Sequence, residues 1–504
     1  MRSRDAAAGA AASGLALGVS ELAAGIFPVL PSLAEGVGNR VVDGVPAPVR
    51  DFAISVFGTA DKAVLLTGIA LVTLGLGALV GVAARRRWWV AGVAFGGFAV
   101  LAAWAATGDP GVSATVAAVP AILAAVTGLT VLWWLYGRTA SATTTEADPS
   151  RRALMTGLGA VAGLAVVAMA TGRVLLERSK RIFSGREDVV LPAAAEPLPE
   201  PGDGAELQVS GITPLFVPND DFYRIDTALF VPRVDIGDWS LEITGAVSRP
   251  YRLTYADILD MPMVERDVTL SCVSNRVGGG LVGNARWLGV PLVEILDRAG
   301  PLPDGEQVVA RSVDGFTVGF PIAAAYDGRD ALLAVGMNGE PLPYEHGFPA
   351  RLVVAGLYGY VSATKWLQTI ELTGWDAFDA YWIPRGWAKE GPVHTQSRID
   401  TPSHLSNIDA GPVVVAGVAW APSRGISGVE VRLGQDSDWV EAEMSVPLSD
   451  SAWVQWKADW DAAPGRHLLT VRATDGDGVV QDEMIRPPAP SGATGWHSIR
   501  VTVA

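Results

Sequence analysis

Long apolar stretches alternate with short polar connections over the first 180 residues of the chain. Five stretches contain at least 20 residues and few charges, at residues 6–30, 63–84, 88–107, 112–136 and 153–176. A helix of that length crosses a hydrocarbon core of about 30 Å, because each residue adds about 1.5 Å. The first stretch is a weaker candidate, because it contains Glu21 and Pro28 and a carboxylate in lipid is costly unless it faces protein or water. The pattern predicts a transmembrane bundle of about five helices.

Basic residues in the connections predict the orientation of this bundle. They lie before the first stretch, between the second and third, and between the fourth and fifth: Arg2, Arg4, Arg85, Arg86, Arg87, Arg138, Arg151 and Arg152. Loops rich in Lys and Arg remain in the cytoplasm, so five spans place the chain after residue 180 on the extracytoplasmic side of the plasma membrane. Four basic side chains within residues 178–186 oppose this orientation, but long domains translocate largely regardless of charge.

The segment Ser150–Met155 precedes the last stretch and contains the pair Arg151 and Arg152. It resembles a twin-arginine export signal, which carries folded, cofactor-loaded domains across the membrane. Ordinary anchoring by positive charge is the alternative. The export reading is favoured, because it also accounts for the weak hydrophobicity of the last stretch.

Beyond the spans, the pattern changes to short elements. Residues 181–205 are rich in Pro, Ala and Glu, as is typical of a linker. Residues 206–400 alternate short predicted strands and helices, which indicates an α+β domain. Residues 410–504 show period-two alternation with regularly spaced turns, which is typical of an all-β, immunoglobulin-like sandwich.

Charge and the placement of His and Cys exclude several functions. The formal net charge of −15 argues against binding to nucleic acid. None of the five histidines lies in an apolar stretch, so a bis-histidine haem within the spans is excluded. A cysteine-held iron–sulfur cluster is also excluded, because Cys272 is the only cysteine. The spans are therefore interpreted as an anchor or docking surface.

Cys272 is the first candidate for chemistry. It stands in a turn that ends with three consecutive glycines, Gly278–Gly280. A lone thiol forms no internal disulfide, so it is an inert buried side chain, a nucleophile or a ligand to a soft metal. Two further segments, residues 218–226 and 338–366, combine polar and aromatic side chains. The second contains His, Arg, Ser, Thr and Lys residues that suit a phosphate group or a pterin edge.

Together these segments resemble the sulfite oxidase family of molybdopterin enzymes. The motifs are the cysteine turn, Ala310–Gly315, Met337–Pro343, His346–Pro349 with Arg351, and Lys365–Leu367. In that family one cysteine thiolate and two pterin sulfurs bind molybdenum, so the resemblance implies Mo-molybdopterin as the cofactor. The C-terminal sandwich resembles the dimerisation domain of the family, which implies a homodimer.

The resemblance also implies roles for individual residues. It implies that Cys272 is the molybdenum ligand and that Arg224 offers a cation to an oxygenated substrate. Contacts with the cofactor are implied for Asp220, Tyr223, Arg224, Ser312, His346, Arg351, Ser362, Thr364 and Lys365. The reaction would be a two-electron oxygen-atom transfer, in which molybdenum cycles between Mo(VI) and Mo(IV).

The chain departs from haem-containing sulfite oxidases in two respects. It shows no cytochrome domain, and Val335 occupies the position of their catalytic tyrosine. Sulfite is therefore one candidate substrate, and methionine sulfoxide is another. Electrons would be exchanged with a separate cytochrome or quinone-linked membrane protein. The alternative function is a catalytically inactive, membrane-tethered scaffold or binding protein with the same fold.

Overall fold

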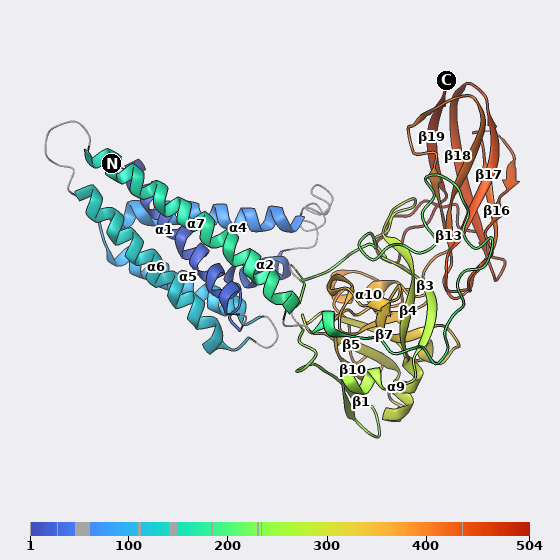
Figure 1. Ribbon diagram of the computed structural model, residues 1–504, viewed down its shortest axis with the longest axis horizontal. Coiled ribbons are helices and arrows are strands. Elements are labelled where there is room, and N and C mark those ends of the chain that lie inside the picture. Colours follow the sequence, from blue (N-terminus) through green and yellow to red (C-terminus); the bar gives the residue numbers. More distant parts are fainter. Residues whose placement is uncertain are drawn as a thin grey trace. The chain divides into compact units, whose positions relative to one another are not determined.

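Figure 1 shows the computed structural model, which describes residues 2–27, 29–45, 61–108, 112–140, 149–182, 185–228, 231–232, 234–435 and 437–504. The chain forms two compact units. The helical unit comprises Met1–Ser184 and Thr227–Arg233, and the sheet unit comprises Gly185–Asp226 and Val234–Ala504. The helical unit thus contains the five apolar stretches, and the sheet unit contains Cys272.

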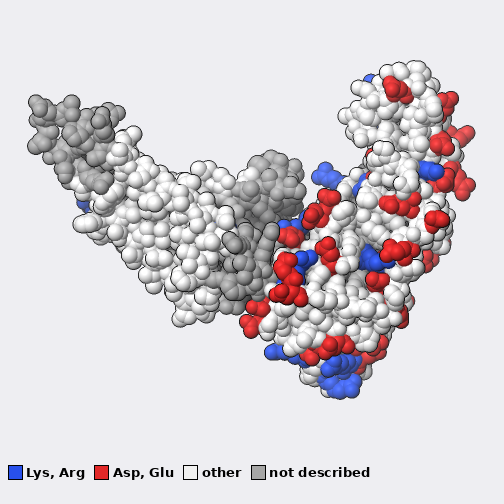
Figure 2. Space-filling view, viewed as in Figure 1, with Lys and Arg blue, Asp and Glu red and all other residues white. Residues whose placement is uncertain are grey.

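The described helices of the helical unit are α1 (Arg2–Ile26), α2 (Leu33–Gly44), α4 (Asp61–Ala84), α5 (Trp89–Ala106), α6 (Ala114–Ala140) and α7 (Pro149–Ile182). All except α2 are long and apolar enough to cross a membrane, at Ser3–Ile26, Val64–Ala84, Trp89–Ala106, Ala114–Gly137 and Met155–Leu176. These spans lie close to the predicted stretches, and Figure 2 shows hardly any charged side chain on the described surface of this unit. The side chains of Arg151 and Arg152 lie outside the described residues, so the export signal stays a prediction.

Helix α1 has the largest buried share of the five long helices, although it is the least hydrophobic. Within its apolar window 56% of the residues are buried, compared with 11% for α4 and 17% for α7. Small residues permit this packing. A Cβ added to Gly9 would lie 2.0 Å from the Gly77 carbonyl oxygen, and one added to Gly25 would lie 2.4 Å from that of Gly172. Because α1 faces protein over much of its surface, it needs less hydrophobicity than a helix in lipid.

Glu21, the carboxylate in the first predicted span, is fully buried in the helical unit. It accepts hydrogen bonds from the Ser32 hydroxyl at 2.8 and 2.9 Å and from the backbone N–H of Ala34 at 3.3 Å. The Arg173 guanidinium of α7 lies 3.4 Å from Glu21 and 3.1 Å from Glu35. The carboxylate therefore faces protein and a cation, which meets the condition for an acidic residue at this depth.

Loss of this cation should destabilise the helical unit. Arg173→Leu leaves Glu21 buried without its arginine, and breaking one side of a buried ion pair costs about 3–5 kcal/mol. We expect the variant to unfold at a lower detergent-denaturant midpoint than the wild type, and Glu21→Gln in the same chain to recover part of the loss. An unchanged midpoint in Arg173→Leu would show that the pair contributes no stability.

Two sheets form the first part of the sheet unit. One has the order β2-β1-β10-β5-β6, from β1 (Ser240–Gly245), β2 (Tyr251–Thr254), β5 (Gln307–Ser312), β6 (Thr317–Pro321) and β10 (Leu367–Thr373). The other has the order β3-β4-β7-β8, with β9 against β7, from β3 (Val264–Ser271), β4 (Val282–Pro291), β7 (Ala331–Met337), β8 (Glu340–Pro341) and β9 (Arg351–Val354). The short helices are α8 (Tyr255–Leu259), α9 (Leu292–Ala299) and α10 (Gly359–Ser362). This architecture agrees with the predicted α+β alternation.

Strand β4 was not predicted, because its glycines interrupt the apolar pattern. It pairs antiparallel with β3, and Ser271 lies opposite Val282. Helix α9 begins at Leu292, directly after the strand ends at Pro291. Residues 272–281 are therefore the connection of a β-hairpin, and Cys272 is the first residue of that connection.

The C-terminal part consists of two sheets around a common core. Their orders are β11-β13-β17-β16 and β12-β19-β18-β14-β15, from β11 (Gln396–Thr401), β12 (Asn407–Ile408), β13 (Gly411–Trp420), β14 (Ile426–Arg432), β15 (Trp439–Glu441), β16 (Glu443–Met444), β17 (Val454–Ala462), β18 (Gly465–Asp475) and β19 (His497–Val503). Trp456 of β17 and Val471 of β18 are both fully buried in this core. The predicted start at residue 410 is too late, because β11 pairs with β13 and belongs to the sandwich. The immunoglobulin-like topology stays a prediction.

The stretch predicted as a linker differs from a free connector. Residues 185–226 belong to the sheet unit and form a strap along it. The strap bonds to the first part through Ala195 N–H and the Met263 carbonyl at 2.7 Å, and to the sandwich through Leu207 N–H and the Gln455 side chain at 2.6 Å. Hydrogen bonds outside regular strands satisfy the backbone N–H and C=O groups of this segment. Such bonds cannot be read from the amino-acid composition of the segment. The strap ends beside the cysteine turn.

Candidate active site around Cys272

The backbone of the hairpin connection determines the position of Cys272. Its N–H donates to the Leu281 carbonyl at 2.9 Å, and its carbonyl accepts from the Asn275 N–H at 3.0 Å. The Asn275 side chain closes the turn by accepting from the N–H of Leu281 at 2.9 Å. The Cys272 side chain is buried, and its Sγ lies 2.9 Å from the Ser274 hydroxyl. The thiol thus lies in a closed turn and has little freedom to move.

Burial raises the pKa of the Cys272 thiol, and hydrogen bonding with Ser274 offsets part of that shift. A raised pKa makes a poor nucleophile at neutral pH, because the thiolate is the reactive form. A bound metal ion displaces the proton and removes the penalty. Of the three roles that the sequence left open, the structure favours a metal ligand or an inert thiol over a nucleophile.

Tyr223 of the strap lies beside the cysteine turn. Its ring stacks on Phe222 at 5.3 Å, and Phe222 meets the rings of Trp287 and His346 edge-on at 5.9 and 5.5 Å. Burial, and then the charge of a Cys272 thiolate, raise the pKa of Tyr223, whereas the Arg351 cation lowers it. The phenol therefore stays protonated and can donate a hydrogen bond near the sulfur.

His346 anchors the strap to the loop before β9. Its Nε2 lies 2.8 Å from the carbonyl oxygen of Asn219, so the ring donates from Nε2. Asn219 in turn accepts from the Asn338 amide at 2.9 Å. Burial, then the Arg351 cation, lower the pKa of His346 to about 4, so the ring is neutral at pH 7. Asn219 was missed from the sequence, although it lies in the segment 218–226 that was singled out.

Arg351 and Thr364 carry polar groups that the protein does not fully satisfy. The Arg351 side chain is buried over the Trp287 ring at 5.0 Å and donates to the His346 carbonyl at 3.1 Å. No carboxylate of the described residues forms an ion pair with it, and burial lowers its pKa to about 10. The Thr364 hydroxyl is buried and has no hydrogen-bond partner among the described residues. A buried cation and an orphaned hydroxyl are costly unless an anionic ligand supplies acceptors.

Arg224 and Lys365 converge on one buried carboxylate. Arg224 Nε and Lys365 Nζ both donate to Asp226, whose side chain is 1% exposed. Lys365 also donates to the Glu345 carbonyl at 3.0 Å. The Arg224 side chain is 37% exposed, so it reaches solvent while it is paired. Two cations thus share one carboxylate.

The remaining predicted residues have other surroundings. The Ser312 hydroxyl accepts from the Asp314 N–H at 3.4 Å, and the Ser362 hydroxyl donates to the Tyr358 carbonyl at 3.1 Å. Asp220 is exposed on the strap. Tyr358 was missed, although it begins the segment that leads to Lys365. Burial raises the pKa of Tyr358 to about 12, and the charge of Cys272 adds to the shift, so its phenol stays protonated at neutral pH.

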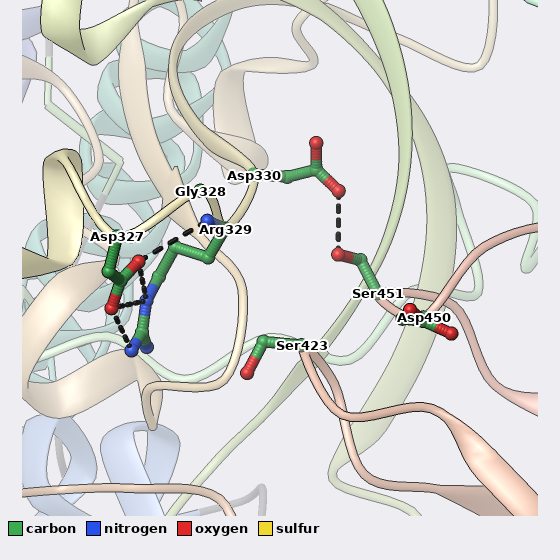
Figure 3. A pocket seen from close by; sticks show the side chains of 7 residues that line it. All are labelled: Asp327, Gly328, Arg329, Asp330, Ser423, Asp450 and Ser451. Carbon is green, nitrogen blue, oxygen red and sulfur yellow. Dashed lines mark hydrogen bonds and ion pairs between the residues drawn. The ribbon is translucent and has the colours of Figure 1, made fainter. Parts of the chain in front are cut away.

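A separate pocket of about 340 Å³ has none of these residues in its wall. It is lined by Asp327, Gly328, Arg329, Asp330, Ser423, Asp450 and Ser451. Figure 3 shows Asp330 accepting from Ser451 at 2.6 Å and Arg329 paired with Asp327. Two of its three carboxylates are thus paired within the chain. The pocket links the loop before β7 to the sandwich and adds no candidate for catalysis.

Comparisons with known proteins identify the domain that contains Cys272. Residues 228–382 match the model of the oxidoreductase molybdopterin binding domain. An uncharacterized oxidoreductase of Bacillus subtilis, YuiH, is 32% identical over 157 residues, which are 31% of this chain and 76% of that protein. The chain belongs to the sulfite oxidase family of molybdopterin-dependent oxidoreductases. The mitochondrial sulfite oxidase of Rattus norvegicus is a family member 30% identical over 365 residues, and the match spans 62% of this chain but only 64% of that relative.

The fold of the family is also evident from a solved structure. The sulfane dehydrogenase SoxCD of Paracoccus pantotrophus aligns over 62% of this chain and 88% of that chain, with a TM-score of 0.50 and 25% identity. Mo-molybdopterin is the cofactor of the family domain. The described residues contain no group of three or more His, Cys, Asp and Glu side chains that could hold a metal ion. A single buried thiol, with a buried cation that also acts on Tyr223, therefore fits a metal whose other ligands come with an anionic organic group.

His346, which is buried, and His497, which is half-buried, predict that the sheet unit loses stability in acid. His346 and His497, the first residue of β19, have pKa values of about 4, against 6.5 in an unfolded chain. The unfolded state therefore binds more protons between these values, so stability is complete above pH 6.5 and falls as the pH falls toward 4. Each shift is worth on the order of 3 kcal/mol at most. We expect the melting temperature from tryptophan fluorescence to fall over this range, and to fall less in His497→Asn. An equal fall of the melting temperature with pH in the wild type and in His497→Asn would contradict this prediction.

Proposed function

We propose that this protein is a membrane-anchored, extracytoplasmic molybdopterin oxidoreductase that transfers an oxygen atom to or from a small oxyanion or a sulfoxide. The observation that carries the proposal is the buried Cys272 thiol in a closed hairpin turn, together with the buried Arg351 guanidinium, since the charges of both groups act on Tyr223. When bound, the molybdenum cofactor supplies two-electron oxygen-atom transfer. The protein supplies position, charge and exclusion of water.

Each residue of the site has a role under this proposal. Cys272 binds the metal as a thiolate, and Arg351 offsets the negative charge gathered there. Ser312, His346, Ser362, Thr364 and Lys365 hold the pterin and its phosphate, with the Thr364 hydroxyl donating the hydrogen bond that it lacks within the protein. Arg224 and Tyr223 face the substrate, and Asp220 lies at the exposed edge. Arg224 attracts an oxygenated group, and its pairing with Asp226 offsets part of its positive charge.

The substrate is not restricted to sulfite. Val335 is fully buried in β7, and a valine side chain has no phenol to supply to the site. Tyr223 and Tyr358 supply protonated phenols from the strap and from the segment before α10, and such phenols can donate a hydrogen bond to an oxygen of a sulfite or of a sulfoxide. Purified protein should be assayed with an artificial electron dye. Sulfite-dependent dye reduction would identify an oxidase, and dye oxidation with methionine sulfoxide would identify a reductase. Inactivity toward both in molybdenum-loaded protein would overturn the proposed chemistry.

The sidedness of the sheet unit follows from the charges of the connections. Arg186, which opposes the orientation, donates to the Pro341 and Leu342 carbonyls at 2.8 Å each, so the folded sheet unit uses its charge. An alkaline phosphatase fusion after residue 205 should be active, and one after residue 85 inactive. The reverse result would place the sheet unit in the cytoplasm.

Electron exchange requires a further protein. All five histidines and Cys272 lie outside the spans, so the spans lack haem ligands of these types. We infer a separate cytochrome or quinone-linked membrane partner, and a homodimer through the sandwich. The inactive scaffold predicts purified, folded protein without molybdenum, whereas the enzyme predicts one molybdenum per chain.

A further inference from the structure

The cysteine turn is contacted by the C-terminal sandwich. Arg398 of β11 donates from Nη1 to the Gly279 carbonyl at 2.9 Å. Its other nitrogens are held as well, because Nε donates to Asp400 at 2.6 Å and Nη2 donates to the Thr213 hydroxyl at 2.7 Å. The guanidinium is therefore fixed by a second strand residue and by the strap, and its third nitrogen donates to the turn.

His497 of β19 contacts the same turn one residue earlier. Its Nδ1 accepts from the Ile399 N–H at 3.0 Å, so the neutral ring carries its proton on Nε2. A Cβ added to Gly278 would lie 2.2 Å from this Nε2, and Gly278 has a φ of +74°. The ring thus occupies the space that any side chain at this position would need. Glycine is required by the backbone conformation and by the close approach.

We propose that Arg398 and His497 are positioning residues that hold the Cys272–Leu281 turn, so that the sandwich helps to set the geometry of the metal-binding thiolate. This rests on the proposed role of Cys272 as the molybdenum ligand. The three glycines at 278–280 carry no side chains to pack the turn from within, and glycine backbone is intrinsically free. The two sandwich side chains remove that freedom from outside. Groups that orient a metal ligand tune the metal as well as its affinity.

The alternative is that both contacts only join the two parts of the sheet unit. Contacts that only join the two parts would affect the stability of the protein but not the electronic state of the metal. Spectroscopy of the molybdenum-loaded protein therefore separates this alternative from the proposed positioning role. Arg472→Gln is a matched control, because Arg472 also lies in the sandwich and pairs with a carboxylate on a neighbouring strand, Glu430, at 2.8 Å. The described contacts of Arg472 include no residue of the turn.

The test uses full-length, molybdenum-loaded wild type, Arg398→Gln, Arg398→Lys, His497→Asn and Arg472→Gln. We expect Arg398→Gln and His497→Asn to shift the Mo(V) paramagnetic resonance spectrum and to lower kcat with the dye about 10- to 100-fold, with KM little changed. Arg398→Lys should restore part of both, and Arg472→Gln should match the wild type. Wild-type spectra in both turn variants, or an equal shift in Arg472→Gln, would overturn the proposal.

A double-mutant cycle gives a second test that does not depend on turnover. Gly278→Ala should shift the Mo(V) spectrum, because its methyl group meets the His497 ring. His497→Ala in the same chain should reduce that shift, since the obstacle is removed and only the backbone strain remains. Additive shifts would contradict the inference. A wild-type protein without a Mo–S(Cys) distance in X-ray absorption would instead refute the proposed function.

Discussion

Cys272→Ser should abolish oxygen-atom transfer and remove the molybdenum–cysteine bond. A serine hydroxyl is a harder ligand than a cysteine thiol and loses its proton less readily. Cys272 supplies the only soft ligand atom of the cysteine turn. The loss should exceed the roughly 10- to 100-fold effect of changing a group that only supports a ligand. Dye-linked turnover and molybdenum X-ray absorption measure the two effects.

Ser274→Ala is the matched control for this substitution. Ser274 lies 2.9 Å from the Cys272 sulfur, yet it is not proposed to bind the metal. The variant should retain the molybdenum–cysteine bond, and its turnover should fall by no more than the roughly 10- to 100-fold expected for a group that only supports a ligand. If Cys272→Ser kept wild-type turnover, the thiol would be an inert core side chain, and the proposed chemistry would fail.

Arg351→Met should deprive the site of its cofactor. The guanidinium is buried without a carboxylate partner, so its charge is available to an anionic ligand. Truncating one partner of a buried charge pair costs about 2–5 kcal/mol, which corresponds to at least a roughly 30-fold weaker affinity. The pterin and molybdenum content of purified protein measures the loss.

Arg311→Gln is the control for this second prediction. Arg311 lies on β5 and pairs with Glu371 at 2.8 Å on the half-exposed surface, so its loss should leave cofactor content unchanged. Arg351→Lys keeps the charge and should retain part of the cofactor. Full cofactor content in Arg351→Met would show that this cation does not hold the pterin or its phosphate.

The candidate site depends on segments far apart in the chain. The strap contributes Tyr223, the hairpin contributes Cys272, the loop before β9 contributes His346, and the sandwich contributes Arg398. The buried carboxylate of Asp226 joins two of the cations predicted to act there. The sandwich therefore has a structural role at the metal site in addition to the dimer proposed for it.

The sequence alone predicted the five long apolar helices, most strands and the cysteine turn, because hydropathy and period-two alternation report which positions avoid water. It also indicated the correct family, whereas the roles of the site residues stay predictions. Other features came only from tertiary structure. These features depend on neighbours far away in the chain. They are the protein surroundings that stabilise the Glu21 carboxylate, strand β4, the strap, the pairing of Arg224 with Asp226, and the contacts of Arg398 and His497 with the turn. Periodicity shows that a side chain is buried, but not which distant residue buries it, and at this site those partners decide the chemistry.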